Sequence, residues 1–372
     1  MQRGLGRREF LTAVGALGAA VATRERLVGA AAQNAASGRR LDLHHHFASP
    51  GMKKRMVEAK RQGWETFRDY SPTQSIDAMD RAGVQTSFLS VSTPGIWFGD
   101  DFAKERRDTI ALAREVNEYG ALLVSDYKGR FGLFAVLPLP DVDASLKEIE
   151  YAFDTLKADG VGLLTSYGDV WLGDPRLQPV FDEINRRRAI VYTHPTDPAC
   201  CHALANGNPA TVEWFVDTAR SINSLIQEPP GARGGGRGAG ADQGPVSQAT
   251  RYGDVTFIWS HGGGALVGTT RVVGAVSPAA LDGTPAPNSR LHHIRRFYYD
   301  TAGAANPIVM PALKRLLGGT SHIVYGTDYP FGGQDGPRNI VTGLQGVGFT
   351  ADELRGIDRD NALTILPKSR TA

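Results

Sequence analysis

The feature that most constrains the fold is a repeated alternation of short apolar runs with longer segments of helical periodicity, which begins at residue 40. Several of the apolar runs have no polar face, as in strands that helices cover. The expected strands are residues 40–47, 84–93, 131–140, 159–167, 189–196, 255–264, 297–303 and 322–331. Helical segments between them include residues 104–127, 143–157, 175–187 and 209–226. This alternation predicts an α/β fold of parallel βαβ units that closes into a (β/α)8 TIM barrel.

Composition is that of an ordinary globular protein. Hydrophobic residues make up 41% of the 372 residues and charged residues 22%, which is enough for a sizeable core. The formal net charge of +2 gives no electrostatic reason to expect nucleic acid or an acidic membrane as a partner. Two adjacent cysteines, Cys200 and Cys201, exclude a disulfide framework, and we interpret them as small buried residues rather than as a soft metal pair.

The N-terminal segment differs from the rest of the chain. Paired arginines (Arg7 and Arg8) precede a weakly apolar stretch from Leu11 to Ala22, and small residues follow near position 30. This order is typical of a twin-arginine export signal, which we place at residues 1–32. The apolar stretch is shorter than the roughly 20 residues that span a bilayer. We therefore expect an exported, periplasmic protein that has no membrane contact once the signal is removed; the alternative is a cytoplasmic protein with a disordered basic tail.

One internal segment interrupts the alternation of strands and helices. Residues 228–248 are rich in Gly, Pro and Ala and contain few side chains that could form a core. We interpret this segment as a flexible surface insertion between the fifth helix and the sixth strand. A phosphate-binding loop is the alternative, but no Gly-Lys-Ser/Thr sequence follows the glycines.

Three consecutive histidines stand in the first expected strand, in the sequence "LDLHHHF". Successive side chains of a strand point to opposite faces, so we expect His44 and His46 on one face, together with Asp42. Two imidazoles on one face can bind a single metal ion. His45 would face the surrounding helices as a packing residue.

Other histidines and acidic residues stand at the ends of other expected strands: His194 in "YTHP", His261 in "WSHGGG" and Asp328 in "YGTDYP". The C-terminal strand ends of such a barrel meet at one mouth, where the active site is built. We therefore expect His44, His46, His194 and Asp328 to bind a divalent metal such as Zn²⁺, with a position left for water or substrate. His261 would stand beside them as a proton shuttle or an electrophile.

Two further features belong to these strand ends. Asp300, at the end of the seventh strand, would support an imidazole or add a carboxylate. The glycines after His261 would allow a sharp turn and a close approach of the substrate.

The motifs "DLHHHF", "THP", "SHGGGAL", "FYYDTA", "GTDYPF" and "DNALTIL" together resemble the amidohydrolase superfamily, and within it the aminocarboxymuconate semialdehyde decarboxylase group. The resemblance covers residues 40–367, which we take as one barrel domain. Residues 90–101, 117–143 and 215–226 are still more similar to the 6-methylsalicylate decarboxylase branch.

This resemblance implies a (β/α)8 barrel, zinc or manganese as the metal, and non-oxidative loss of CO₂ from a small aromatic or conjugated carboxylic acid. Asp328, or His261 through a water molecule, would supply the proton. Trp97 and Phe98 would cover the aromatic ring or else pack on the barrel rim. We expect a homodimer or a higher homo-oligomer. The alternatives are a metal-dependent lactone or amide hydrolase, a hydratase, and a binding protein without turnover.

Overall fold

The computed structural model describes residues 40–60, 64–98, 101–198, 200, 208–227, 247–274 and 276–366. The proposed export signal lies outside these residues, as does the Gly-rich insertion except for Ser247 and Gln248. Cys200 is exposed, so its predicted burial is wrong, and Cys201 lies outside the described residues. Within the described part of the chain we find no helix with the length and apolarity needed to cross a lipid bilayer.

Eight parallel strands form the central sheet, in the order in which they follow one another along the chain. The ring closes between the last strand and the first, where Leu43 N donates to Tyr325 O (3.0 Å) and His46 N donates to Tyr329 O (2.7 Å). The predicted barrel is thereby confirmed, and each strand falls within its predicted segment. The strands are β1 (Arg40–His46), β2 (Val84–Ser90), β3 (Phe131–Val136), β4 (Gly160–Leu164), β7 (Ile190–His194), β8 (Thr256–Trp259), β9 (Tyr298–Asp300) and β10 (Ile323–Val324), and β5 (Ser166–Tyr167) and β6 (Val170–Trp171) form a separate hairpin.

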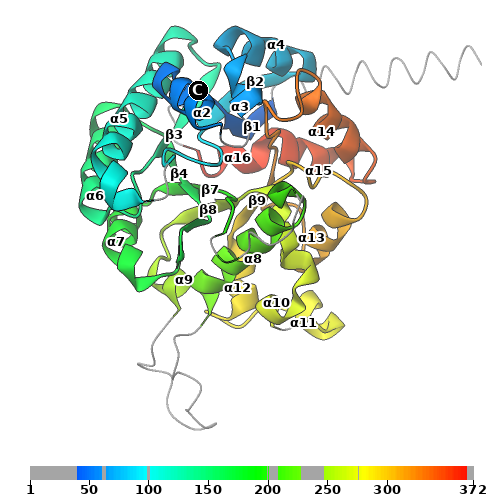
Figure 1. Cartoon of the computed structure of the whole chain (residues 1–372). Helices are drawn as coiled ribbons and strands as arrows, with labels where there is room; N and C mark the ends of the chain where they lie inside the picture. The colour runs from blue at the N-terminus through cyan, green and yellow to red at the C-terminus, as the bar shows by residue number, and fades with distance from the viewer. Residues whose placement is uncertain are drawn as a thin grey trace, which may run out of the picture.

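Helices surround the sheet on all sides (Figure 1). The main ones are α2 (Pro50–Ala59), α3 (Trp64–Arg68), α4 (Pro72–Ala82), α5 (Phe102–Asp126), α6 (Val142–Glu150), α7 (Gln178–Arg186), α8 (Glu213–Ile226), α12 (Arg290–Arg296), α13 (Val309–Leu317) and α14 (Gly336–Gln345). Shorter helices are α9 (Gln248–Arg251), α10 (Thr270–Val273), α11 (Pro278–Asp282), α15 (Ala351–Arg355) and α16 (Asn361–Leu363). Short 3-10 or π-helical segments are η1 (Tyr151–Thr155), η2 (Pro175–Leu177), η3 (Pro209–Thr211), η5 (His261–Gly268) and η6 (Gly356–Asp360).

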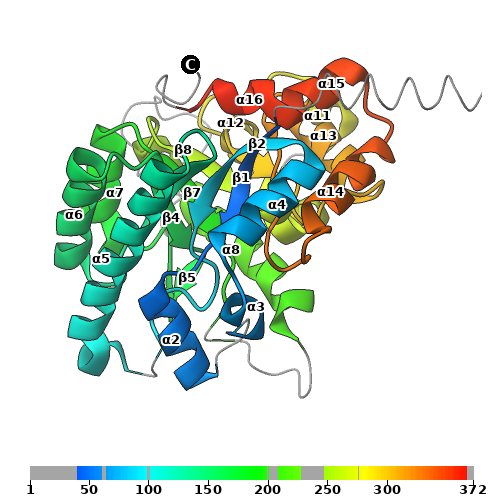
Figure 2. The same cartoon turned by 90° about the horizontal axis from the view of Figure 1, so that it is seen from above.

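Apolar side chains fill the barrel interior, and the C-terminal segment covers one of its ends. Ala362 and Leu366 pack into the interior cluster, and the Arg40 guanidinium pairs with Asp358 of η6 at 3.0 Å. Figure 2 shows α15 and α16 at this end and α2 and α3 at the opposite end. The strand starts are therefore closed, and the C-terminal strand ends are left to form a site. The strand side chains of the interior cluster are Leu41, Leu43, Phe88, Phe134, Ile190, Tyr192, Ile258 and Val324.

Strand β1 has a β-bulge between Asp42 and His45. Leu43 packs in the interior cluster, and the His44 ring lies 5.3 Å from the Tyr192 ring of that cluster, so two consecutive residues face inward. Asp42 faces outward and contacts His45, whose Nδ1 lies 2.9 Å from its carboxylate. The prediction that Asp42 shares the face of His44 is wrong, because the extra residue of a bulge shifts the alternation of side chains. The predicted outward orientation of His45 is confirmed.

Candidate metal centre

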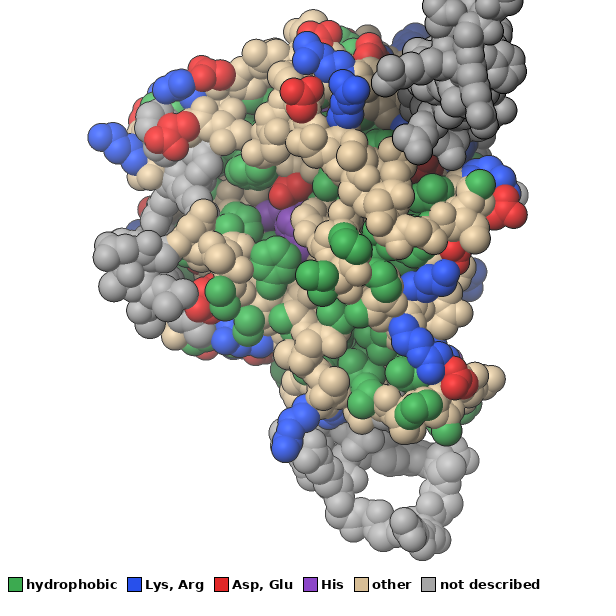
Figure 3. Space-filling model, turned by 90° about the vertical axis from the view of Figure 1, so that its right-hand side faces the viewer, with side chains coloured by type: hydrophobic (Ala, Val, Ile, Leu, Met, Phe, Trp, Pro, Cys, Tyr) green, Lys and Arg blue, Asp and Glu red, His purple; other side chains and the backbone are tan. Residues whose placement is uncertain are grey.

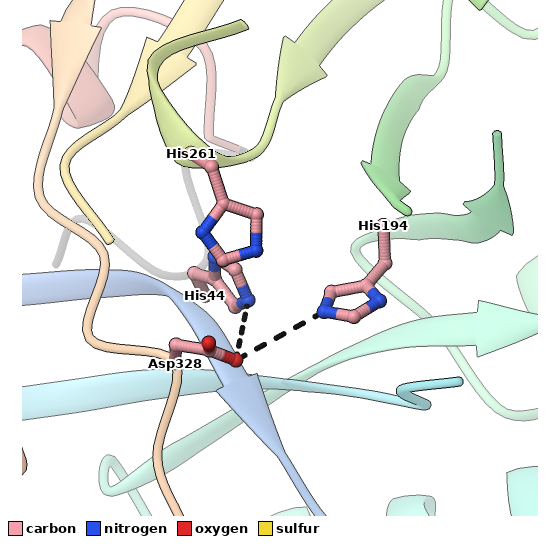
Figure 4. A group of neighbouring side chains, drawn as sticks. All are labelled: His44, His194, His261 and Asp328. Carbon is pink, nitrogen blue, oxygen red and sulfur yellow. Dashed lines mark ion pairs between the residues drawn. The ribbon is translucent and has the colours of Figure 1, made fainter. Parts of the chain in front are cut away.

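The predicted histidines and Asp328 converge at the C-terminal end of the barrel, and Figure 4 shows four of these residues. His44 and His46 come from β1, His194 ends β7, His261 follows β8, and Asp328 follows β10. One Asp328 oxygen, Oδ1, lies 3.1 Å from His44 Nε2 and 3.1 Å from His46 Nε2. The Nε2 atoms of His44 and His46 are 3.0 Å apart, and His194 Nε2 lies 3.9 Å from Asp328 Oδ1.

The other ring nitrogen of each histidine, Nδ1, faces an acceptor. His44 Nδ1 lies 2.8 Å from the Asp300 carboxylate, and His46 Nδ1 lies 3.3 Å from Ser90 O. His194 Nδ1 lies 2.8 Å from Pro195 O, and His261 Nδ1 lies 3.1 Å from Ala302 O. Because carbonyl oxygens only accept, the Nδ1 atoms of His194 and His261 carry the hydrogen, and their Nε2 lone pairs are left for a ligand. The Ser90 hydroxyl also lies 3.2 Å from His46 Nδ1 and can donate or accept there.

This donor set fits a divalent cation. The Nε2 atoms of His194 and His261 are buried and have no hydrogen-bond partner among the residues that the structure describes. One ligand atom from each of His44, His194, His261 and Asp328 lies within 4.8 Å of the others. Imidazole nitrogens and a carboxylate are donors that Zn²⁺ and Mn²⁺ both accept. His46 is equally close to Asp328, so the geometry is compatible with the predicted set and with one in which His261 is a ligand.

In the metal-free site the histidines differ widely in pKa. Burial lowers the pKa of His44, but the Asp300 and Asp328 carboxylates outweigh it and raise that pKa to about 10. Burial lowers the pKa of His46 to about 4 and that of His194 to about 3. Burial works to raise the pKa of Asp328, yet the neighbouring His44 charge and imidazole hydrogen bonds hold it well below its usual range. A proton on His44 thus occupies the place that a cation would take.

Asp300 supports two site residues from one buried position. Its Oδ2 faces His44 Nδ1, and its Oδ1 accepts hydrogen bonds from the backbone N–H groups of His261 (2.9 Å) and Ala302 (3.0 Å). The predicted support of an imidazole by Asp300 agrees with these contacts.

Two site residues have a backbone conformation that is rare outside glycine. His261 has φ of 54° and Asp328 has φ of 60°. Such conformations cost of order 1–3 kcal/mol and persist where the surrounding structure enforces them, often at functional sites. Both residues lie shortly after a strand, and their side chains point into the centre (Figure 4).

The three glycines after His261 form the predicted sharp turn, with φ of 63°, 79° and 61°. A Cβ on Gly263 would lie 2.9 Å from the Tyr299 ring, and one on Gly264 would lie 2.4 Å from Phe215 O. The protein itself therefore fills the Cβ positions of these two glycines, and the close approach of a substrate stays a prediction.

Trp97 and Phe98 lie in the loop after β2. The Trp97 ring packs edge-on against Phe102 of α5 at 5.5 Å, and the Arg55 guanidinium of α2 lies 5.9 Å from the centre of the Phe98 ring. These contacts place both residues on the barrel rim. Their contact with a substrate ring stays a prediction.

Three aromatic residues that were not predicted from the sequence lie beside the histidines. Phe331 ends the motif "GTDYPF", so its position was a usable signal. Trp214 and Phe215 lie on α8, where aromatic residues in a helical pattern are usually core residues. The ring centroids are 5.9 Å apart for His46–Phe331, 5.8 Å for His194–Trp214 and 5.6 Å for His261–Phe215.

Solvent reaches the centre at Asp328. The Asp328 side chain is 22% exposed, whereas those of His44, His46 and His194 are at most 1% exposed. In the space-filling view, histidine side chains and an acidic one are visible in a hollow whose surroundings are largely hydrophobic side chains and backbone (Figure 3). A small molecule with a carboxylate and an apolar body would suit such surroundings.

Comparisons with known proteins agree with this architecture. The amidohydrolase family model matches residues 41–368. Decarboxylase yanB of Aspergillus niger is 32% identical over 88% of this chain and 88% of its own length, and 6-methylsalicylic acid decarboxylase of Penicillium expansum is 29% identical over 88% and 96%. A solved dihydroxybenzoic acid decarboxylase from Polaromonas, with bound manganese and the inhibitor 2-nitroresorcinol, has the same fold: TM-score 0.68 and 19% identity over 88% of this chain and 96% of that one. The family match spans nearly all of the described barrel, and the chain belongs to the amidohydrolase family.

Proposed function

We propose that the protein is a metal-dependent, non-oxidative decarboxylase of a small aromatic carboxylic acid of the salicylate type. The observation that carries this proposal is the cluster of buried histidines that hold their Nδ1 atoms against acceptors and turn their Nε2 atoms toward the Asp328 carboxylate. The decarboxylases that are 32% and 29% identical over 88% of the chain support the same reaction class.

The reaction replaces a carboxylate by hydrogen. A proton adds to the ring carbon that bears the carboxylate. The bond from that carbon to the carboxylate then breaks, CO₂ leaves, and the electron pair of the broken bond stays with the ring and restores its aromaticity. A divalent cation held by the proposed ligands would supply Lewis-acid stabilisation of the substrate's negative charge and would help to position the substrate. The aromatic side chains of Phe331, Trp214 and Phe215 would border the ring and keep water away from it.

His261 is the proton carrier in this proposal. Asp328 is ionised, since its pKa lies well below the usual range, and therefore acts mainly as a metal ligand. His261 Nε2 is buried and without a partner, while its Nδ1 is held by Ala302 O. A ring fixed in this way can hold a proton at Nε2 and release it toward the substrate.

The ligand set that we propose is His44, His46, His194 and Asp328. Zn²⁺ suits these donors, and Mn²⁺ is the alternative that the manganese-containing relative favours. Metal analysis of the purified protein by mass spectrometry would identify the ion.

A product measurement tests the function. The metal-loaded protein, incubated with a panel of salicylates, lactones and amides, should release one CO₂ for each salicylate consumed and yield the corresponding phenol. If lactones or amides are hydrolysed with release of acid and no salicylate yields CO₂, the protein is a hydrolase and not a decarboxylase. A decarboxylated product should carry one solvent deuterium on the ring when the reaction is run in D₂O.

We also propose that residues 1–32 direct export and are removed, and that the mature protein forms a homodimer or a higher oligomer. The paired arginines and the short apolar stretch support the first point. N-terminal sequencing of the protein from a periplasmic fraction would test export, and light scattering of the purified protein would give the oligomeric state. An intact N-terminus in the cytoplasm would overturn the export proposal.

A further inference from the structure

Asp42 is a fully buried carboxylate outside the candidate metal centre, and the proposed reaction does not use it. Its Oδ1 accepts hydrogen bonds from two backbone amides, His44 N (3.1 Å) and Thr327 N (3.1 Å). Its Oδ2 faces three side chains: His45 Nδ1 at 2.9 Å, Ser87 Oγ at 3.1 Å and Thr327 Oγ1 at 2.7 Å. Buried carboxylates with so many donors hold a structure in place.

A reactive role is excluded by burial. His45 Nε2 lies 2.5 Å from Ser75 Oγ, so Ser75, His45 and Asp42 form a chain that resembles the triad of a serine hydrolase. All three residues have no solvent exposure. A substrate cannot meet a serine in that position.

Through these two amides, Asp42 connects β1 to the segment after β10, and both carry proposed metal ligands. One amide belongs to His44, and the other to Thr327, the residue before Asp328. Because of the bulge in β1, His44 does not pair in register with β2, so Asp42 supplies the acceptor for its amide. The peptide groups also meet directly, since His44 O accepts hydrogen bonds from Thr327 N (3.2 Å) and Asp328 N (2.9 Å).

We propose that Asp42 is a positioning residue that sets the relative placement of His44 and Asp328 and thereby the affinity of the metal centre. Asp42 lies on the outer face of β1 and acts through its hydrogen bonds to the two backbone amides. Its side chain would contact neither substrate nor metal. This inference rests on the proposed metal binding. Loss of such supporting contacts lowers metal affinity by about 10- to 100-fold in other proteins.

The test measures Mn²⁺ binding rather than activity. Metal-free full-length protein is titrated with Mn²⁺, and free Mn²⁺ is quantified by its electron paramagnetic resonance signal. We expect Asp42→Ala to bind Mn²⁺ about 10- to 100-fold more weakly than the wild type. We expect Asp42→Asn to stay within about tenfold, since the amide oxygen can still accept from both backbone amides while the hydroxyls and His45 reorient around the amide nitrogen.

The matched control is Asp358→Ala. Asp358 is also a buried aspartate in contact with β1, but it pairs with Arg40 at the opposite end of that strand. Its loss should lower the melting temperature and leave Mn²⁺ affinity unchanged. Wild-type affinity in Asp42→Ala, or equal weakening in Asp358→Ala, would overturn the inference. Absence of Mn²⁺ and Zn²⁺ binding in the wild type would instead overturn the proposed metal centre itself.

If Asp42→Ala does not fold, a second pair of variants tests the role of Asp42. Thr327 and Ser87 donate to the same Asp42 oxygen, but only Thr327 belongs to a ligand-bearing segment. Thr327→Val should weaken Mn²⁺ binding, and Ser87→Ala should not. Equal affinities of the two variants would contradict the proposed role of Asp42.

Discussion

At the scale of the residue, the orientation of each imidazole decides what the centre can bind. The positions of His44, His194 and Asp328 at strand ends could be predicted from the sequence, because a barrel brings its strand ends together. The partners of the Nδ1 atoms could not be predicted, since Pro195 O and Ala302 O are backbone atoms whose direction depends on the folded loops.

Alanine variants of His194 and His45 should differ in metal binding. His194→Ala should lose bound metal and activity, because its Nε2 faces the centre without another partner. His45→Ala should keep both and lose only stability, because its ring contacts Asp42 and Ser75 behind the strand. Metal content after dialysis, together with CO₂ release, checks both variants. Full metal occupancy and rate in His194→Ala would contradict the ligand assignment.

Replacement of His261 distinguishes a proton carrier from a ligand. His261→Asn should retain the metal and lower kcat by about 10²- to 10⁴-fold, the usual contribution of a positioned acid. Metal content measured alongside kcat decides the point. Loss of metal from this variant would place His261 in the ligand set, as the clustering with His44, His194 and Asp328 allows.

Metal affinity should depend on pH through His44. Its pKa in the metal-free protein is raised to about 10. Below that pH the ring binds a proton that must leave when a cation binds, so affinity should rise with pH, by about tenfold per unit, until the pKa is reached. Mn²⁺ titrations between pH 6.5 and 8.5 measure the slope. An affinity independent of pH would show that no proton is displaced.

At the scale of the element, the strands were predictable and their irregularities were not. Each apolar run became a strand, because both faces of such a run are buried in a barrel. The bulge in β1 escaped prediction because an inserted residue leaves no mark on the hydrophobic pattern of "RLDLHHH". Asp42 was therefore placed on the wrong face, whereas its outward position explains how it reaches two backbone amides.

The turn η5 makes a prediction at the same scale. Gly264 has φ of 61°, and a Cβ there would lie 2.4 Å from Phe215 O. Gly264→Ala should therefore destabilise the protein by about 2 kcal/mol or more and displace His261. Gly268→Ala, in the same turn, is the control, since nothing lies within 4 Å of its Cβ position. Thermal unfolding of the two variants compares them, and equal melting temperatures would refute the steric argument.

At the scale of the whole molecule, the candidate centre lies across the seam where the barrel closes. Strand β10 is only two residues long, Ile323 and Val324, and beyond it the chain returns to β1 through contacts around His44 and Asp328. The sequence could predict that a barrel closes, but not that the closing strand is so short, because the apolar run from Ile323 to Tyr325 does not mark where strand pairing ends. A cation held by residues of β1, β7 and the segment after β10 would connect this seam to the opposite wall.

Metal removal should therefore lower the stability of the folded protein and loosen the barrel at this seam. A cation at 100 times its dissociation constant stabilises the folded state by about 2.7 kcal/mol, so a chelator should lower the melting temperature by several degrees. In His194→Ala, which should bind little metal, the chelator should change the melting temperature far less. Differential scanning calorimetry with and without chelator measures the melting temperatures of both proteins.

Hydrogen exchange should locate the loosening at the β1–β10 seam, where His46 N donates to Tyr329 O at 2.7 Å. Unchanged protection of that amide in the metal-free wild type would mean that the seam is held by backbone pairing alone.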